Sequence, residues 1–300
     1  MKLSALAVAL SISLVGTVHA ADIKLPSGID YFRLKLLDRG KPMQVYVNMV
    51  GIGDKSDAKL LVSNRVGESI GNHAQMDRRF MDAIHETNRF EVYDDASGGI
   101  RDKSDIVVDG MIVASTQDIN DLTAIRKAVT TVRLSIQIKD TSTGKLIKAR
   151  TVTGVEGDEA GKGTVITNEA ALKSKEVQER LANDYERALT DALRSAAAFI
   201  ERTMRPVARM QEIEGKTVMI IGGANHGIRE GDKLTVFRAK TTRVGETETF
   251  GIMKPVAIIE CSSVNTDSSQ CEIKETGNQE PPQKGDYAVL SDESLKLHME

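Results

Sequence analysis

The clearest pattern along the chain is an alternation of apolar and polar residues over 129–154. Every second residue from Val132 to Ile138 is apolar, and the residues between them are polar. This period of two is typical of an antiparallel strand with one buried face. A polar turn then reaches Gly144, a residue that tolerates a positive φ, and a second run of strand-forming residues follows it. The pattern predicts a β-hairpin over 129–154.

Further segments before residue 206 show either strand or helix spacing. β-branched or alternating runs predict strands at 44–50, 89–93 and 105–114. Apolar residues recur at three- and four-residue steps over 58–86 and 174–205, which predicts two helices. Helices and a sheet in this order predict an α/β domain.

The pattern of apolar runs and glycines changes in the last third of the chain. Short β-branched runs are separated by glycines, a pattern that predicts a small β-barrel or sandwich. Two of the turns carry a Gly-Asp pair, Gly231-Asp232 and Gly285-Asp286, in which glycine accommodates the turn and aspartate accepts hydrogen bonds from nearby N–H groups. The predicted fold class is α+β, divided into a signal peptide (1–20), an N-terminal extension (21–42), an α/β domain (43–207) and a small β-domain (212–292).

The first twenty residues have the three-part pattern of a secretory signal peptide. A basic start at Lys2 precedes an uncharged apolar run over 3–18, and Ala20 and Ala21 flank a small-residue cleavage site. No later stretch is long and apolar enough to span a membrane as a helix. We therefore expect a periplasmic protein, associated with the outer membrane only through partners.

Composition narrows the functional class. The 300 residues carry 40 Lys+Arg and 43 Asp+Glu, a net charge of −3, which argues against a nucleic-acid partner. Aromatic residues make up 4% of the chain, fewer than a sugar- or base-stacking site would use. Globular proportions of apolar and charged residues argue against general disorder.

Two cysteines occupy the ends of a predicted hairpin loop in the β-domain. In an oxidising compartment, Cys261 and Cys271 can form a disulfide that closes a loop of about ten residues and contributes about 2–3 kcal/mol. The alternative is two unpaired small residues. A redox site is disfavoured because the Cys-x-x-Cys spacing is missing.

Candidate chemistry elsewhere is weak. The histidines form no zinc-binding spacing, and the acidic stretch 118–121 lacks the pattern of a calcium loop. The glycine-rich segment 222–227 lacks the Gly-Lys-Ser/Thr ending of a phosphate loop. We predict no catalytic, cofactor-binding or metal-binding residue, and no cofactor.

Three strand motifs resemble a known family. Arg89-Phe-Glu-Val-Tyr93, the run 105–113 and the run 132–145 follow one another as in the periplasmic α/β domain of the curli assembly/transport component CsgG family. The same arrangement resembles the TolB N-terminal domain. The resemblance implies a related α/β fold, but no lipid-anchor cysteine follows the cleavage site, and the connections 115–128 and 155–168 read as short and polar. We therefore expect a relative of that family that builds no pore.

The C-terminal region carries a second resemblance. Val218 to Gly223, then Gly227 to Val236, then the Gly285-Asp286 pair resemble the C-terminal domain of the flagellar assembly protein FlgT. Together the resemblances imply a non-enzymatic periplasmic scaffold of a cell-envelope machine of the secretion, curli-like or flagellar ring type. Its partners would be envelope proteins or further copies of the chain in a ring. The alternatives are an adaptor or activator of an envelope enzyme and, less favoured, an envelope hydrolase.

Overall fold

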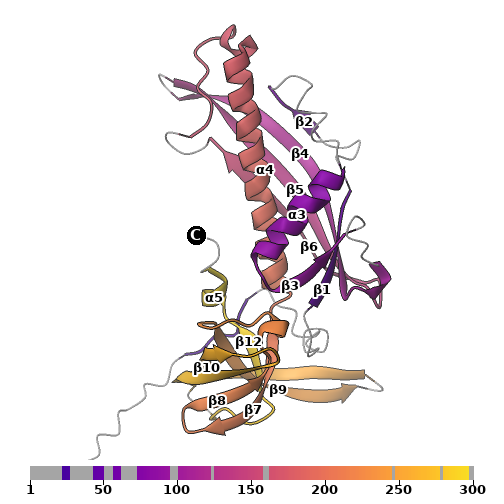
Figure 1. Cartoon of the computed structure of the whole chain (residues 1–300), viewed down its shortest axis with the longest axis vertical. Helices are drawn as coiled ribbons and strands as arrows, with labels where there is room; N and C mark the ends of the chain where they lie inside the picture. The colour runs from indigo at the N-terminus through magenta and orange to yellow at the C-terminus, as the bar shows by residue number, and fades with distance from the viewer. Residues whose placement is uncertain are drawn as a thin grey trace, which may run out of the picture.

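The structure is a computed structural model that describes residues 22–27, 43–50, 57–61, 73–94, 101–122, 125–157, 162–244, 247–277 and 280–296. A sheet domain with two helices stands on a closed barrel, and the chain enters the barrel directly after the long helix α4 (Lys175–Thr203) (Figure 1). The predicted signal peptide, including Ala20 and Ala21, lies outside the described residues.

The sheet domain contains a six-stranded mixed sheet in the order β3-β1-β4-β5-β6, with β2 pairing alongside β4. β1 runs parallel to β3 and β4, whereas β4, β5 and β6 are antiparallel neighbours. The strands are β1 (Met43–Val50), β2 (Asp57–Lys59), β3 (Phe90–Tyr93), β4 (Ile106–Leu122), β5 (Ile125–Asp140) and β6 (Leu146–Glu156).

Helices α3 (His73–Glu86) and α4 cover one face of this sheet (Figure 1). The Oγ of Ser174 accepts a hydrogen bond from the Val177 N–H at 3.3 Å and so caps the start of α4. α4 approaches β6 closely at Gly154, where a Cβ would stand 2.0 Å from the Ala188 carbonyl oxygen. A residue with a side chain would therefore force the helix away from β6.

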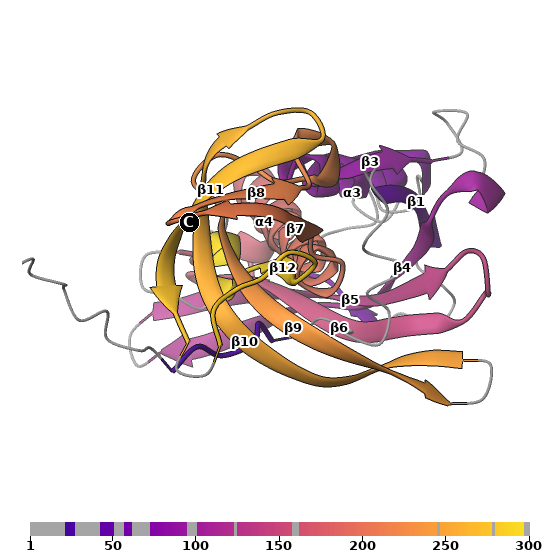
Figure 2. The same cartoon turned by 90° about the horizontal axis from the view of Figure 1, so that it is seen from below.

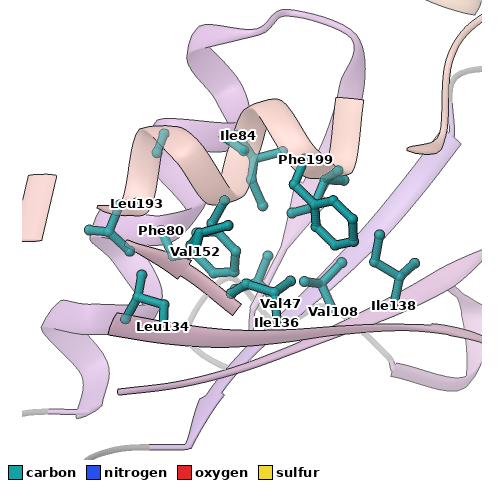
Figure 3. Close-up of a cluster of buried hydrophobic side chains, with 14 of the residues drawn as sticks. Val47, Phe80, Ile84, Val108, Leu134, Ile136, Ile138, Val152, Leu193 and Phe199 are labelled. Atoms are coloured by element: carbon teal, nitrogen blue, oxygen red, sulfur yellow. The ribbon is translucent and has the colours of Figure 1, made fainter. Parts of the chain in front are cut away.

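The core of the sheet domain lies between the helices and the sheet. Apolar side chains of both helices and of the strands meet there, as Figure 3 shows for Val47, Phe80, Ile84, Val108, Leu134, Ile136, Ile138, Val152, Leu193 and Phe199. All are almost inaccessible to solvent. The alternation of β5 from Val132 to Ile138 thus places one full row of apolar side chains in the core.

The C-terminal part of the chain closes a barrel in the order β10-β11-β8-β7-β12-β9, viewed from below in Figure 2. Its strands are β7 (Val207–Glu214), β8 (Thr217–Ile221), β9 (Lys233–Val244), β10 (Thr247–Val264), β11 (Ser268–Thr276) and β12 (Tyr287–Leu290), followed by α5 (Asp292–Lys296). β9 and β10 continue together as a long hairpin beyond the positions where β11 and β12 pair with them. Short 3-10 turns occur at η2 (Arg101–Lys103), η3 (Ala171–Lys173) and η4 (Ala224–His226).

The predicted α+β class, with a helix-covered sheet domain and a C-terminal barrel, is confirmed. Two details of the sequence interpretation were wrong. The predicted helix over 58–86 begins within the strand β2 and is helical from His73, with 62–72 outside the described residues. The predicted polar connection 115–128 is mostly strand, because β4 and β5 stay paired as far as Leu122 and Ile125. Polar composition had suggested a loop there, but the ladder continues because strand pairing uses backbone groups, whatever the side chains are.

Candidate functional site

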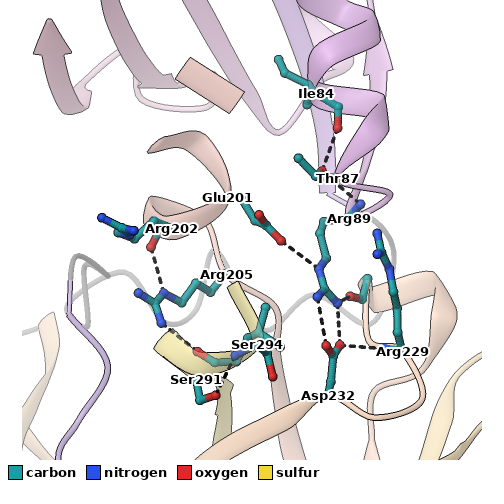
Figure 4. Close-up of polar contacts among 12 residues, drawn as sticks. Ile84, Thr87, Arg89, Glu201, Arg202, Arg205, Arg229, Asp232, Ser291 and Ser294 are labelled. Carbon is teal, nitrogen blue, oxygen red and sulfur yellow. Dashed lines mark hydrogen bonds and ion pairs between the residues drawn. The ribbon is translucent and has the colours of Figure 1, made fainter. Parts of the chain in front are cut away.

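The main polar cluster of the molecule lies where the sheet domain meets the barrel, and Arg89 is at its centre. Arg89 directly precedes β3, and its side chain is completely shielded from solvent. Its Nε donates to Glu201 Oε1 at 3.0 Å, and its two terminal nitrogens donate to the Asp232 carboxylate at 2.5 and 3.0 Å (Figure 4). The Gly227 carbonyl oxygen accepts a further bond from Arg89. Three chain segments, from β3, α4 and the barrel, thus converge on one cation.

In this cluster, the buried positive charge of Arg89 is balanced by nearby carboxylates. Burial alone would lower the pKa of Arg89, but the hydrogen bonds and charges of Asp232 and Glu201 outweigh it, so the pKa of Arg89 is raised. For nearby Arg229, burial and the charge of Arg89 lower the pKa. Arg89 therefore stays charged and holds two carboxylates of different domains.

Asp232 belongs to the first of the two predicted Gly-Asp turns. Its Oδ2 also accepts a hydrogen bond from the Arg229 N–H at 2.8 Å, and Gly231 has a φ of +83°. The second turn repeats this arrangement: Asp286 accepts the Gln283 N–H at 2.8 Å and receives two bonds from Arg238, each 2.9 Å. The preceding Gly285 has a φ of +89°. Each aspartate thus closes a turn and binds an arginine, although only Asp232 reaches across to the sheet domain.

A second buried arginine lies beside the junction. Arg205 follows α4, is fully buried and donates to the Leu290 carbonyl at 2.9 Å and to the Arg202 carbonyl at 3.0 Å. It also pairs with Asp292 in α5 and bonds the Ser27 carbonyl. Burial raises the pKa of Asp292, but hydrogen bonds from Arg205 and Ser27 outweigh it and lower that pKa.

Apolar packing joins the same two domains. Phe237, Tyr287 and Val289 of the barrel belong to the core cluster of the sheet domain. The rings of Phe237 and Tyr287 stack with centroids 5.6 Å apart. At Gly227 a Cβ would stand 2.8 Å from the Arg89 carbonyl oxygen, so the barrel turn packs directly on the backbone before β3. Because apolar and ionic contacts coincide, the two domains are expected to behave as one rigid unit.

The remaining predicted residues lie away from the junction. Gly144, with a φ of +64°, is in the β5–β6 turn, where Asp140 Oδ1 accepts the Ser142 N–H at 2.9 Å. Cys261 and Cys271 face each other directly in the β10–β11 ladder, with their Sγ atoms 2.38 Å apart. Both cysteines are buried in the barrel core.

The sequence interpretation missed Arg89, Glu201 and Arg205. The sequence position of Glu201 could have indicated a buried ion pair. It lies four residues after Ala197 on the apolar stripe of α4, where an acidic residue needs a buried partner. The position of Arg89 gave no such indication, since a single arginine before a strand is ordinarily solvated. Pairing it with a carboxylate 143 residues away requires the tertiary structure.

Surface grooves run beside α4, including a narrow one of about 130 Å³ against α3 and two larger ones. The largest of these three, about 590 Å³, includes Glu156, Asn183, Arg187, Asp191 and Arg194 in its lining. A further groove, about 350 Å³, lies between β6 and the last turns of α4 and includes Arg150, Phe199 and Arg202. Within the described part of the chain, no group of three or more His, Cys, Asp or Glu side chains is arranged to hold a metal ion.

The fold and this junction define a two-domain protein in which a helix-covered mixed sheet is fastened to a six-stranded barrel. Residues 215–290, most of that barrel, match the family model described as the C-terminal domain of flagellar assembly protein T. No curated protein matches the chain. None of the described helices combines the length and apolar character needed to cross a membrane.

Several solved structures are similar to about half of this chain. A DUF330 family protein from Xanthomonas campestris is 13% identical, with 52% of this chain and 81% of that chain covered and a TM-score of 0.34. A neuraminyllactose-binding hemagglutinin homolog from Helicobacter pylori is 14% identical, with 54% and 84% covered and a TM-score of 0.33. PelC from Paraburkholderia phytofirmans is 9% identical, with 55% and 89% covered and a TM-score of 0.30. All three scores are below 0.5, so these neighbours do not define a function.

Proposed function

We propose that this protein is a non-enzymatic periplasmic assembly protein of a bacterial cell-envelope machine, and that it acts by docking to other proteins. The observation that carries the proposal is the match of 215–290 to the flagellar assembly protein T C-terminal domain. The secretory pattern of 1–20 supports a periplasmic location. The likeness of the strand motifs over 89–145 to the CsgG family and the TolB N-terminal domain supports an envelope role.

The junction supports a scaffold role in physical terms. A scaffold must hold its docking surfaces at a constant separation, because any hinge between them adds an entropic cost to assembly. Arg89 binds Glu201 of the sheet domain and Asp232 of the barrel, and the apolar core continues between them. Surfaces on the two domains would then be presented to partners in one fixed arrangement.

Envelope fractionation with crosslinking tests the proposal. A C-terminally tagged chain is expressed from its own locus, cells are crosslinked, and the protein is purified from the envelope fraction for mass spectrometry. We expect recovery from the periplasm together with components of one envelope assembly. Retention in the cytoplasm, or recovery from the periplasm without any envelope partner, would refute the proposal.

Light scattering on the purified protein then separates the two forms of scaffold. A ring subunit should form a defined oligomer, and an adaptor should be monomeric. Turnover of a test glycan or peptide by the purified protein would instead favour an envelope hydrolase.

A further inference from the structure

The outer edge of β6 is a strand edge next to a helix. β6 is the last strand of its sheet in the order β3-β1-β4-β5-β6. The Val155 N–H points outward, because it donates to Asp191 Oδ2 on α4 at 3.2 Å and not to β5. Since backbone N–H groups alternate sides along a strand, the N–H groups of Thr153 and Thr151 also point outward. Both threonines are exposed.

A groove runs along this edge. Gly154 lets α4 touch β6, and Asp191 caps the edge on the side of Val155. On the other side of Gly154, toward the barrel, the strand and the helix enclose the groove of about 350 Å³. Its lining is formed by residues 150–153 of β6 and by Ser195, Ala198, Phe199 and Arg202 of α4. We call this feature the β6–α4 groove.

The charge of the β6–α4 groove is positive. Arg150 and Arg202 are the charged residues in its lining, and no carboxylate is among the lining residues. The Arg150 guanidinium carbon lies 5.9 Å from the centroid of the buried Phe199 ring, a distance consistent with a cation–π contact. Arg133, opposite Thr153 on β5, adds an exposed cation on the other face of the sheet. An added strand would therefore meet positive charge on both of its faces.

An exposed edge with an arginine could simply be protected against pairing with another edge. That protection requires one projecting charge, and Arg150 alone would provide it. The β6–α4 groove offers more: two outward peptide groups, an apolar floor at Phe199 and a second, half-buried cation at Arg202. This combination of backbone pairing and side-chain pockets is the one used when an extended peptide is added to a sheet edge.

We propose that the β6–α4 groove binds an extended acidic segment of a partner protein, which adds to β6 as a further strand. The segment would pair with the outward groups of Thr151 and Thr153 and place carboxylates near Arg150 and Arg202. A contact along 149–153 corresponds to about 17 Å of strand. The inference rests on the docking function proposed above and names the chemistry of one partner.

Selection from a displayed library of linear decapeptides, with the purified protein as bait, tests this proposal. Enriched peptides are synthesised with a fluorophore and titrated by fluorescence polarisation. We expect them to carry Asp or Glu at alternate positions. Arg150→Glu should weaken their binding by about tenfold or more, because it removes a charge-assisted hydrogen bond and introduces repulsion.

Two further variants separate backbone pairing from general electrostatics. Thr153→Pro removes one outward N–H; proline is tolerated on such an edge, and circular dichroism should show an unchanged fold. We expect it to weaken the same peptides to a similar extent. Arg180→Glu makes the same charge change at the exposed, distant start of α4 and should leave binding unchanged.

The results that would overturn the proposal are specific. They are the absence of any enriched peptide, enriched peptides without acidic residues, or binding that survives both Arg150→Glu and Thr153→Pro. Self-association that these two variants abolish would also overturn it, because the occupant would then be a second copy of the chain. The crosslinking experiment on the envelope role does not depend on this edge, so the two proposals can fail separately.

Discussion

Replacing Arg89 with methionine tests the junction most directly. The change removes a fully buried cation and leaves the Glu201 and Asp232 side chains, which are 4% and 6% exposed, without their ionic partner. Methionine fills most of the vacated volume, so the cost arises mainly from two buried carboxylates that lose Arg89 and keep only the weaker attraction of nearby Arg229. Removing one member of a buried ion pair typically costs about 3–5 kcal/mol. That is a large part of the 5–15 kcal/mol by which domains are usually stable.

Urea denaturation followed by far-ultraviolet circular dichroism provides the measurement, because the chain contains no tryptophan for fluorescence. We expect Arg89→Met to lower the free energy of unfolding by about 3–5 kcal/mol at pH 7.

A compensated variant serves as the control. Arg89→Met combined with Glu201→Met and Asp232→Asn removes both carboxylates, and the asparagine can still accept the Arg229 N–H. This triple variant should be more stable than Arg89→Met at pH 7. A loss below about 1 kcal/mol for Arg89→Met would refute the reasoning, since breaking a buried pair costs more. A triple variant that is no more stable than Arg89→Met would refute it as well.

Three further changes have expected outcomes. Gly154→Ala should lower the free energy of unfolding in urea by about 1–3 kcal/mol, since its Cβ would stand 2.0 Å from the Ala188 carbonyl oxygen; an unchanged value would contradict the close approach. Cys261 and Cys271 should resist alkylation in the unfolded protein until a reductant is added, as mass spectrometry would show. Reduction should lower the free energy of unfolding by about 2–3 kcal/mol. Alkylation without reductant would argue against the disulfide. Burial alone would raise the pKa of Asp109, but hydrogen bonds from a lysine and an asparagine outweigh burial and lower that pKa. The stabilisation that Asp109 contributes to the folded state is therefore present above about pH 4 and lost as the pH falls. Asp109→Asn should therefore flatten the acid side of the stability profile measured from pH 7 to pH 2, and an unaltered profile would contradict this assignment.

Local patterns in the sequence accounted for much of the architecture. The alternation from Val132 to Ile138 identified the central hairpin, since one buried face imposes a period of two. The three- and four-residue spacing over 174–205 matched α4, Lys175–Thr203, almost to the residue. Glycine-rich turns identified the C-terminal β-domain. These elements were predictable because the spacing that defines each of them involves residues of a single segment.

Weak or conflicting local patterns led to the errors. The polar residues before Leu122 suggested a loop, yet β4 and β5 remain paired there because their backbones supply the hydrogen bonds. The strand β7 (Val207–Glu214) opens the barrel, although its sequence mixes charged and apolar residues without clear alternation. Its place depends on pairing with β8, which follows it directly, and with β12, which lies far along the chain.

The sequence by itself determined most of the order of helices and strands, the two-part organisation and the Gly-Asp turns, because each depends on spacing among neighbouring residues. Only the tertiary structure decided that Arg89 meets Glu201 and Asp232, and that β6 leaves an edge beside Arg150 and Arg202. The physical reason is one of range. Backbone preference and hydrophobic period act within about a dozen residues, whereas the burial of a charge is favourable only when folding brings its counter-charge from elsewhere in the chain.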